Sequence, residues 1–312
     1  MKKLSTFITI VTLILWVSHA HAENSGAAFL RLGVGARPIG MGSAFVAIAN
    51  DANAVFWNPG GLSQIKTQEI SAMHTEWLAD INYDYVGYIH PFGKNAVGLS
   101  MIYLCTGDLD KRSATGADLG SFEAYDGAFA LSYARKISSV LHMGMNIKLI
   151  QQKIEEETAE GFAIDIGQVY SLPMTGLSFG LAVQNIGPDM KFVQDPFKLP
   201  LTVVGGVGYS MLGVITVGVD VKHLVVDEKT SISFGTEYSP VGVLSLRAGY
   251  LARILKTGND TGDIAGIESD LGGLTGLGAG MGFRLGPASV DYAFVPYGDL
   301  GNTHRISFLA KF

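Results

Sequence analysis

The sequence contains little charge and almost no cysteine. Asp, Glu, Lys and Arg make up 16% of its 312 residues, whereas an average soluble domain carries about 25%. The single cysteine, Cys105, excludes an intrachain disulfide framework and a zinc site built from several cysteines. The net charge of −6 argues against a nucleic-acid-binding protein, which displays a basic surface. Low charge together with a mean hydropathy of +0.29 argues against a disordered chain.

Long hydrophobic runs are also missing after the first 22 residues. Residues 1–22 combine a basic start, Met1–Lys3, with an apolar run, Phe7–Val17, and a small-residue cleavage pattern, Ala20–Ala22. This is the pattern of a secretory signal peptide, so we expect the mature chain to begin at Glu23. A membrane anchor is disfavoured because the run is shorter than the ~18–20 residues that a spanning helix needs. Later apolar stretches are interrupted by glycine, proline or a charged residue.

What the sequence has instead is alternation with a period of two residues. In Leu141–Leu149, Val214–Leu224 and Leu277–Leu285, apolar residues occupy one parity and small or polar residues the other. Because successive strand side chains point to opposite faces, each segment predicts a strand with one apolar face. Fourteen such runs begin near Gln68, Tyr83, Asn95, Ala124, Val140, Gly161, Leu177, Leu199, Val214, Ser231, Leu244, Thr275, Ala288 and Thr303. An even number of strands is typical of bacterial outer-membrane barrels. Residues 66–312 are therefore predicted to form an all-β fold, a fourteen-stranded antiparallel transmembrane β-barrel.

The lengths of the predicted connections favour a barrel over a secreted soluble β-sandwich, which is the rival architecture. Connections after even-numbered runs are short, as at Pro91–Lys94 and Gly286–Pro287. Connections after odd-numbered runs contain the long insertions, at residues 106–122, 186–198 and 252–274. Outer-membrane barrels have short periplasmic turns and longer extracellular loops. A soluble sandwich has no reason to sort its connections in this way.

The last predicted strand ends on the final residue of the chain. Ile306, Phe308 and Phe312 lie on its apolar face. This strand resembles the aromatic-ended strand that the assembly machinery of the outer membrane reads. We therefore expect these three side chains to form an assembly signal.

The other parity of the strands carries charges of both signs. A charge that faces lipid costs ~2–4 kcal/mol near the middle of the membrane, so these side chains are expected to face the lumen. Both signs together favour a polar network over a selectivity ring of one sign. The predicted lumen-facing charges are Asp84, Asp126, Lys148, Asp165, Asp220, Lys222, Glu237, Arg247, Arg284, Asp291 and Arg305.

Residues 23–65 do not alternate and are rich in small residues, which permit close backbone packing. Pro59 fixes its own φ and keeps Asn58 extended, which predicts a turn. A fourteen-stranded barrel is wider than the filled eight-stranded barrels and narrower than open porins. We therefore predict that this segment is a hatch that plugs the lumen, with Asn58 capping backbone groups. The hatch residues are Asp51, Phe56, Trp57, Asn58, Pro59 and Gly60; a periplasmic tail with a solvated turn is the alternative.

A series of short motifs runs through the mature chain. They are Gly33–Arg37, Ala44–Ala47, Asp51 with Asn58, Pro59 and Leu62, His74–Trp77, Gln184–Gly187, Arg247–Tyr250, Asp291–Phe294 and Gly301–Ser307. On these motifs the chain resembles the PorV/PorQ family of outer-membrane proteins, which are similar to FadL-type long-chain fatty acid transporters. The likeness to FadL rests on fourteen strands and the Asn-Pro turn, after which this chain has Gly60 where alanine is usual. The resemblance implies a FadL-like barrel in the outer membrane, with an internal hatch.

Patterns for catalysis and metal binding are weak. Gly176–Gly180 matches G-x-S-x-G, but that motif needs a strand-to-helix elbow, and Ser178 lies on a predicted strand. The glycines at alternate positions of 276–282 precede no helix that could bind an anion; they leave one strand face bare, with room for a plug. The histidines are too dispersed for a metal site. Acidic runs at 155–160 and 260–270 fall in predicted extracellular loops, either solvated or bound to a hard cation. We expect no enzyme activity, cofactor or metal.

Three functions fit these observations. The first is a FadL-like channel for hydrophobic small molecules. The second, implied by the resemblance, is an accessory component of type IX protein secretion that binds exported substrates through extracellular loops. The third is a structural or adhesive surface barrel. The expected partners are outer-membrane lipid, the barrel assembly machinery, and hydrophobic small molecules or secretion-system subunits, without nucleic acid. The barrel is expected to be a monomer.

Overall fold

Fourteen antiparallel strands of the protein form a closed barrel, which excludes the β-sandwich. The computed structural model describes residues 25–76, 81–172, 176–254, 267–268, 276–297 and 301–312. The predicted signal peptide lies outside these residues. Among the residues described, no helix is long and apolar enough to cross a membrane.

The barrel strands follow the predicted order along the chain. They are β1 (Glu69–Glu76), β2 (Ile81–Phe92), β3 (Asn95–Arg112), β4 (Asp118–Lys136), β5 (Leu141–Ile154), β6 (Glu157–Leu172), β7 (Leu177–Ile186), β10 (Thr202–Met211), β11 (Ile215–Leu224), β12 (Lys229–Val241), β13 (Leu244–Ile254), β15 (Leu277–Leu285), β16 (Ala288–Pro296) and β17 (Asn302–Lys311). Three short strands lie outside the barrel proper: β8 (Met190–Phe192), β9 (Asp195–Phe197) and β14 (Ile267–Glu268).

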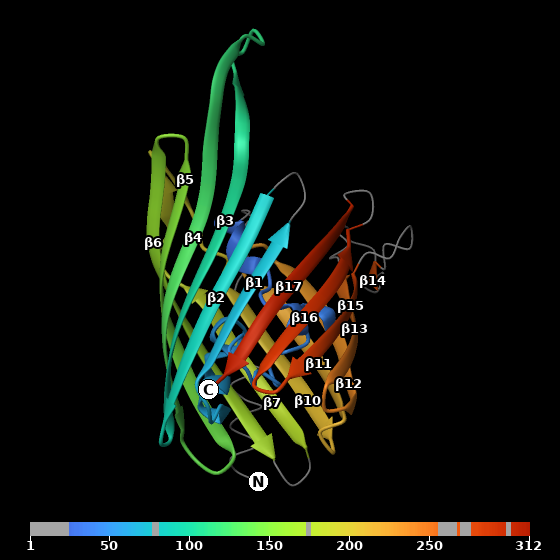
Figure 1. The fold of residues 1–312 in the computed structure, drawn as a ribbon. Coiled ribbons are helices and arrows are strands. Elements are labelled where there is room, and N and C mark those ends of the chain that lie inside the picture. Colours follow the sequence, from blue (N-terminus) through green and yellow to red (C-terminus); the bar gives the residue numbers. More distant parts are fainter. Residues whose placement is uncertain (1–24, 77–80, 173–175, 255–266, 269–275, 298–300) are drawn as a thin grey trace, which may run out of the picture.

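The first and last strands close the barrel. β1 pairs with β17 over its whole length, from Glu69 opposite Lys311 to Glu76 opposite His304. Just before β1, the backbone of Gln68 exchanges two hydrogen bonds with that of Phe312. Every other barrel strand pairs with its neighbours along the chain, apart from the short β8, β9 and β14. The seam between β1 and β17 is visible in Figure 1.

The alternation predicted from the sequence is confirmed in the strands. On β5, Met143, Met145, Ile147 and Leu149 are exposed on the outside of the barrel, whereas His142, Asn146 and Ile150 of the other parity are buried. The same pattern places Ile306, Phe308 and Phe312 outside, with 56%, 44% and 64% of their surfaces exposed. Their role as an assembly signal stays a prediction.

The connections at one end of the barrel are more ordered than the sequence indicated. The predicted loop at 106–122 is mostly strand, because β3 continues to Arg112 and β4 begins at Asp118; Figure 1 shows this hairpin projecting beyond the other strands. Of the acidic run at 155–160, Glu157 and Glu160 belong to β6 rather than to a loop. The 186–198 insertion folds into the β8–β9 hairpin. We call this end the long-loop end, and the opposite end the short-turn end.

On β2 the odd-numbered residues face the lumen, whereas the prediction for Asp84 required the even-numbered ones to do so. Tyr83 and Tyr85 are fully buried toward the lumen, where their hydroxyls donate hydrogen bonds to the carbonyls of Leu32 and Ala52. Asp84 between them faces outward, so its assignment to the lumen is wrong. The reason is physical: β2 has polar or aromatic residues on both parities, and the bulky tyrosines fill space inside the barrel.

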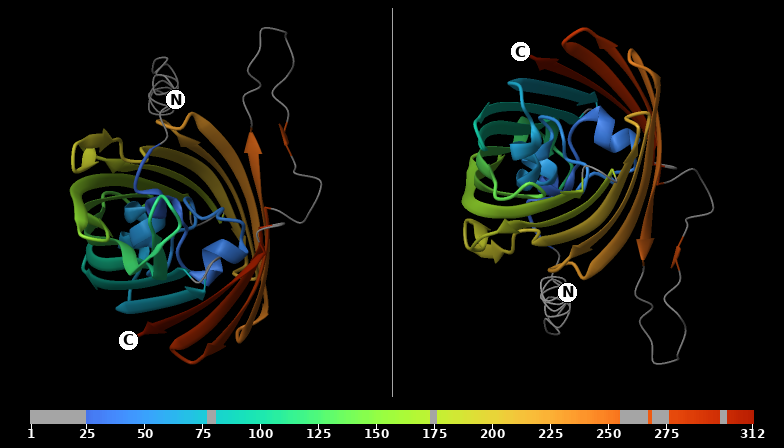
Figure 2. Two further views of the ribbon diagram at one scale, coloured as in Figure 1. Left: turned by 90° about the horizontal axis from the view of Figure 1, so that it is seen from above. Right: turned by 90° about the horizontal axis from the view of Figure 1, so that it is seen from below.

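The chain from Ser25 to Ile65 runs through the inside of the barrel. It contains four short helices: η1 (Ala28–Arg31), α2 (Ala36–Gly40), α3 (Ala54–Trp57) and η2 (Pro59–Gln64). Its start lies at the long-loop end, where the Gly26 amide donates to the carbonyl of Lys198 at 3.0 Å. It leaves at the short-turn end, where β1 begins beside the C-terminus. Both views in Figure 2 show this segment enclosed by the ring of strands. We call residues 25–65 the lumen segment.

Candidate functional site in the barrel lumen

The inner wall carries a band of glycines, one or two on each of eight strands. We call this band the glycine belt: Gly144, Gly167, Gly180, Gly206, Gly208, Gly218, Gly235, Gly249, Gly278 and Gly280. Many of its members are direct cross-strand partners. Gly218 on β11 pairs with Gly208 and with Gly235, Gly235 pairs with Gly249, and Gly249 pairs with Gly278. The belt therefore forms a nearly continuous strip without side chains.

The backbone of the lumen segment lies directly on the glycine belt. A Cβ atom added at Gly235, Gly249 or Gly180 would come closer than 3.0 Å to backbone atoms of Met41, Gly42 or Val46. Added at Gly144 it would meet the backbone of Pro59 equally closely. Real Cβ atoms essentially never approach so closely, and backbone cannot move aside as a flexible side chain can. Glycine is therefore required in these strands for the segment to fit inside.

A buried charge cluster fixes the first half of the lumen segment. Arg37 on α2 makes a two-pronged ion pair with Glu237 of β12, with Nε and Nη2 each 2.8 Å from a carboxylate oxygen. Its Nη1 lies 2.7 Å from Asp51. Arg247 of β13 contacts the same Glu237 at 2.6 Å and Asp291 of β16 at 2.6 Å. Two arginines thus face three carboxylates across three strands and the segment.

The electrostatic balance keeps Arg37 charged. Burial favours its neutral form, but the carboxylates of Glu237 and Asp51 outweigh that effect and raise its pKa well above the ordinary value. Such bidentate contacts combine charge with fixed geometry. Breaking a buried pair by removing one partner costs about 3–5 kcal/mol, because the other charge stays buried.

Asp220 holds the middle of the lumen segment by its backbone. One carboxylate oxygen of this β11 residue accepts hydrogen bonds from the amides of Phe45 and Val46, at 2.7 and 2.8 Å. Lys222, two residues along on the same face, places its ammonium 5.7 Å from the ring centre of Trp57. Both predicted lumen charges therefore contact the segment.

Asn58 joins the two halves of the segment to the wall. Its side-chain oxygen accepts a hydrogen bond from the Gly60 amide, and its nitrogen donates to the carbonyls of Val46 and Gln168 at 2.8 and 3.0 Å. The residue is fully buried. Pro59 and Gly60 follow in η2.

The second half of the segment is held by neutral hydrogen bonds. Gln184 of β7 donates to the carbonyls of Phe56 and Trp57, and Asn146 of β5 donates to that of Val55 at 2.7 Å. Hydrogen bonds and ion pairs with charged residues of the barrel thus lie mainly in residues 25–52, where Asp227 also holds Ser25 and Arg31, whereas Lys222 reaches the second half through the ring of Trp57.

The remaining predicted charges are spread over the wall. Lys148 lies 2.8 Å from Asp165, which also accepts from Asn146. Asp126 accepts from Gln152 at 2.8 Å. Arg305 is buried and donates to the carbonyl of Gly33 at 2.6 Å. Arg284 has the lumen parity but is exposed at the short-turn end of β15.

Sequence reasoning missed Arg37, Gln184 and Asn146 as site residues. Arg37 could have been found in the sequence, because residues 25–65 contain only one other basic residue, Arg31. Nothing in the sequence identifies Gln184 and Asn146, since a polar residue on a strand does not reveal that its side chain reaches a backbone carbonyl of another segment.

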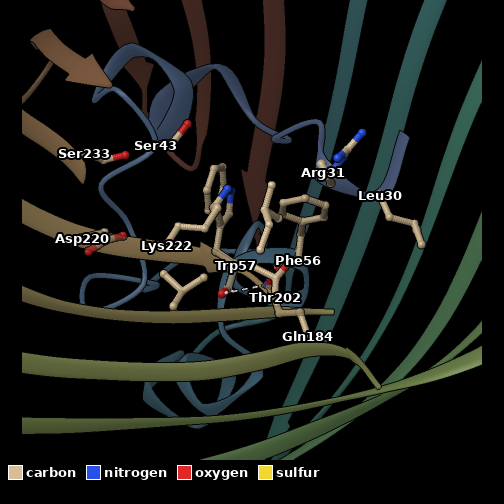
Figure 3. A pocket seen from close by; sticks show the side chains of 12 residues that line it. Leu30, Arg31, Ser43, Phe56, Trp57, Gln184, Thr202, Asp220, Lys222 and Ser233 are labelled. Atoms are coloured by element: carbon tan, nitrogen blue, oxygen red, sulfur yellow. Dashed lines mark hydrogen bonds between the residues drawn. The ribbon is translucent and has the colours of Figure 1, made fainter. Parts of the chain in front are cut away.

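A small cavity remains between the segment and the wall. Its volume is about 20 Å³, and its lining includes Phe56, Trp57, Lys222 and Gln184 (Figure 3). This is room for about one water molecule, whereas an engineered cavity of roughly 150 Å³ binds benzene. This cavity is therefore too small for a ligand larger than a water molecule.

The described structure does not support a catalytic serine at the G-x-S-x-G match or a metal site. Ser178 lies on β7 and donates a hydrogen bond to the carbonyl of Gly208. Within the described part of the chain, no three His, Cys, Asp or Glu side chains are arranged to hold a metal ion. The side chains of the acidic run at 260–270 lie outside the described residues.

Several solved structures have a similar fold. The chain is similar to the CymD monoaromatic hydrocarbon channel, with a TM-score of 0.66, 13% identity, and coverage of 90% of this chain and 98% of that one. It is also similar to the Ralstonia pickettii toluene transporter TbuX, with a TM-score of 0.63, 12% identity, and coverage of 90% and 98%. A Pseudomonas aeruginosa FadL homologue has a TM-score of 0.57 and 10% identity, with coverage of 86% of this chain and 95% of that one. At these identities the likeness shows the fold alone.

The protein is thus an outer-membrane β-barrel with a FadL-like fold. The family profile described as type IX secretion system protein PorV matches residues 18–230. The chain belongs to this family, as its motifs indicated. A search of curated proteins finds no significant match.

The glycine belt predicts a steric effect of a single methyl group. Gly249→Ala should displace the backbone at Met41 and Gly42 and destabilise the barrel by about 1–3 kcal/mol, as overpacking does. Gly127→Ala is the matched control, because its Cβ would have only ordinary contacts at 3.9 Å. The temperature at which each purified protein loses its compact form on a detergent gel gives the comparison. Equal temperatures for the two variants would contradict the tight fit.

Proposed function

We propose that this barrel is a channel for hydrophobic small molecules and that the lumen segment is its hatch. The observation that carries the proposal is that residues 25–65 run through the barrel from one end to the other, and that the cavity beside Phe56 and Trp57 holds only about 20 Å³. Structures of similar fold include a protein described as a monoaromatic hydrocarbon channel and one described as a toluene transporter. A channel of this build has to move its hatch in order to pass a ligand.

The second half of the hatch is the part that we propose to move. Residues 37–51 are tied to the wall by the ion pair of Arg37 with Glu237 and by the carboxylate of Asp220, and Asp51 holds Arg37 from within the segment. Residues 54–64 are held by neutral hydrogen bonds from Asn146 and Gln184. A neutral hydrogen bond contributes about 0.5–1.5 kcal/mol net, and bonds to charged groups about 1.5–3. The neutral contacts therefore release first.

A reversible disulfide tests this movement. A Cβ at Gly98 of β3 would lie 3.1 Å from Cγ2 of Val55, close to the roughly 3 Å that separates a Cβ atom from the far sulfur in a disulfide. Val55→Cys with Gly98→Cys, in a Cys105→Ala background, should lock the hatch when oxidised. Uptake of a radiolabelled monoaromatic hydrocarbon by whole cells should fall on oxidation and recover on reduction.

The two single-cysteine variants are the controls and should not respond to oxidation. Unchanged uptake in the locked protein would contradict the movement of residues 54–64. Uptake by cells with the parent protein that is no faster than uptake by cells without it would contradict the channel itself.

A second candidate function is a role in type IX protein secretion, in which the barrel binds exported proteins. The family supports it, since its description names that system. The structural observation that favours it is the β3–β4 hairpin, which projects from the long-loop end. On this hairpin, 39% of the surface of Leu109 and 56% of that of Leu119 are exposed. We propose that this end faces the cell exterior, as the long loops of such barrels do.

Site-specific photocrosslinking tests the secretion role. A photoreactive residue at Leu119 should capture an exported protein in living cells. The same residue at Leu285, which is 75% exposed at the short-turn end, is the control. Absence of any exported protein from the Leu119 product, or its equal capture from Leu285, would contradict binding at the hairpin.

We also propose that the barrel assembly machinery reads Ile306, Phe308 and Phe312. Their outward position at the end of the strand that closes the barrel supports this role.

A further inference from the structure

The seam between β1 and β17 joins the two strands that lie farthest apart in the sequence. Among the barrel strands that the structure describes, the other neighbouring pairs follow one another along the chain, apart from the short β8, β9 and β14. A pairing that closes a longer stretch of chain costs more conformational entropy. The seam therefore depends more than other strand pairs on contacts outside its own ladder.

The lumen segment contacts both strands of the seam where α2 begins. The amide of Gly35 donates to the sulfur of Met73 on β1 at 3.1 Å, and the amide of Ala36 donates to Oγ of Ser307 on β17 at 3.0 Å. Met73 and Ser307 are buried and lie directly opposite each other across the seam. Two consecutive amides of the segment thus bind a single cross-strand pair.

A second contact lies nearer the short-turn end. The amide of Ala52 donates to Oε2 of Glu69 on β1 at 3.1 Å. The other carboxylate oxygen of Glu69 lies 2.7 Å from Nζ of Lys311, its cross-strand partner on β17. Beside it, Oγ of Ser71 donates to the side-chain oxygen of Asn53 at 3.2 Å. One buried carboxylate therefore connects β1, β17 and the segment.

Asn53 links the two contacts to each other. A Cβ atom added at Gly35 would lie 2.6 Å from the side chain of Asn53, so this side chain packs on the Gly35 backbone. Its nitrogen also donates to Asp51 at 2.9 Å, and Asp51 in turn holds Arg37. The two parts of the segment that reach the seam therefore form one unit, which we call the seam clamp: Gly35, Ala36, Ala52 and Asn53.

We propose that the lumen segment has a second function, in which the seam clamp holds β1 and β17 together. Contacts that exist only when the seam is paired shift the equilibrium toward the closed barrel. Opening the seam would also leave Glu69, Ser71 and Ser307 without these partners, and buried polar groups that lose a partner are costly. The clamp lies outside residues 54–64, which we propose to move, so the seam stays closed while that half of the hatch is displaced.

Amide hydrogen exchange of the purified protein in detergent micelles tests the clamp. Asn53→Ala removes the partner of Ser71 and the packing on Gly35. It should speed exchange of the amides of β1 and β17 roughly tenfold, because loss of such contacts makes local opening more frequent. Exchange in β5, on a distant part of the wall, should stay as in the parent.

Asn58→Ala is the matched control, because it truncates another buried asparagine of the segment, one that binds the wall at Gln168 of β6. It should leave exchange in β1 and β17 unchanged. If Asn53→Ala does not fold, Ser71→Ala removes the same hydrogen bond from the wall side. Its control is Ser132→Ala on β4, a buried serine whose hydroxyl has no hydrogen-bond partner among the described residues.

Three results would overturn the proposal. The first is unchanged exchange in β1 and β17 after Asn53→Ala, or after Ser71→Ala where that variant replaces it. The second is an equal increase in β5, which would indicate general loosening of the barrel. The third is the same increase at the seam from the matched control. None of these measurements depends on whether the lumen conducts a hydrophobic molecule, so the clamp and the channel are tested separately.

Discussion

Close contact between two backbones, that of the hatch and that of the wall, is the constraint on which the rest of this structure depends. The glycine belt leaves a nearly continuous strip without Cβ atoms beneath residues 39–48 and 58–60. Without it, the same fourteen strands would enclose a lumen too narrow for a folded segment. The belt also explains why glycine is so frequent in strands, where it otherwise weakens pairing and packing. The cost in strand stability is offset by the close packing of the segment on the wall.

Polar groups then decide how the hatch is oriented. Two arginines and three carboxylates connect α2 to β12, β13 and β16, and Asp220 captures two consecutive amides. These contacts satisfy backbone groups and charges that a dry plug would otherwise leave unpaired. The arrangement leaves one half of the hatch strongly tied and the other half weakly tied. We propose that this asymmetry makes the plug movable, because a cavity of about 20 Å³ is too small to pass a ligand.

Much of the fold was predictable because alternation and connection length are local properties. Strands such as β5 and β11 have one clearly apolar parity, so their faces follow from the sequence. The faces of β2 could not be predicted in this way, because its tyrosines pack inside the barrel while Asp84 pairs with His74 outside. The long β3–β4 hairpin was also missed, since its polar residues resemble a loop. In the hatch, Asn58 was predicted from its turn chemistry, whereas the partners of Arg37 depend on contacts 200 residues apart in the chain.

Residues 25–65 run through the lumen, and we propose that they close it. Asn58 is the most direct test, because its single side chain connects Val46, Gly60 and the β6 carbonyl of Gln168. Ion conductance across planar bilayers is the measurement, comparing the parent with the Asn58→Ala, Pro59→Ala double variant. We expect the parent to be silent and the variant to conduct, because the strands still assemble while the plug loosens. A variant that is correctly inserted and as silent as the parent would contradict it.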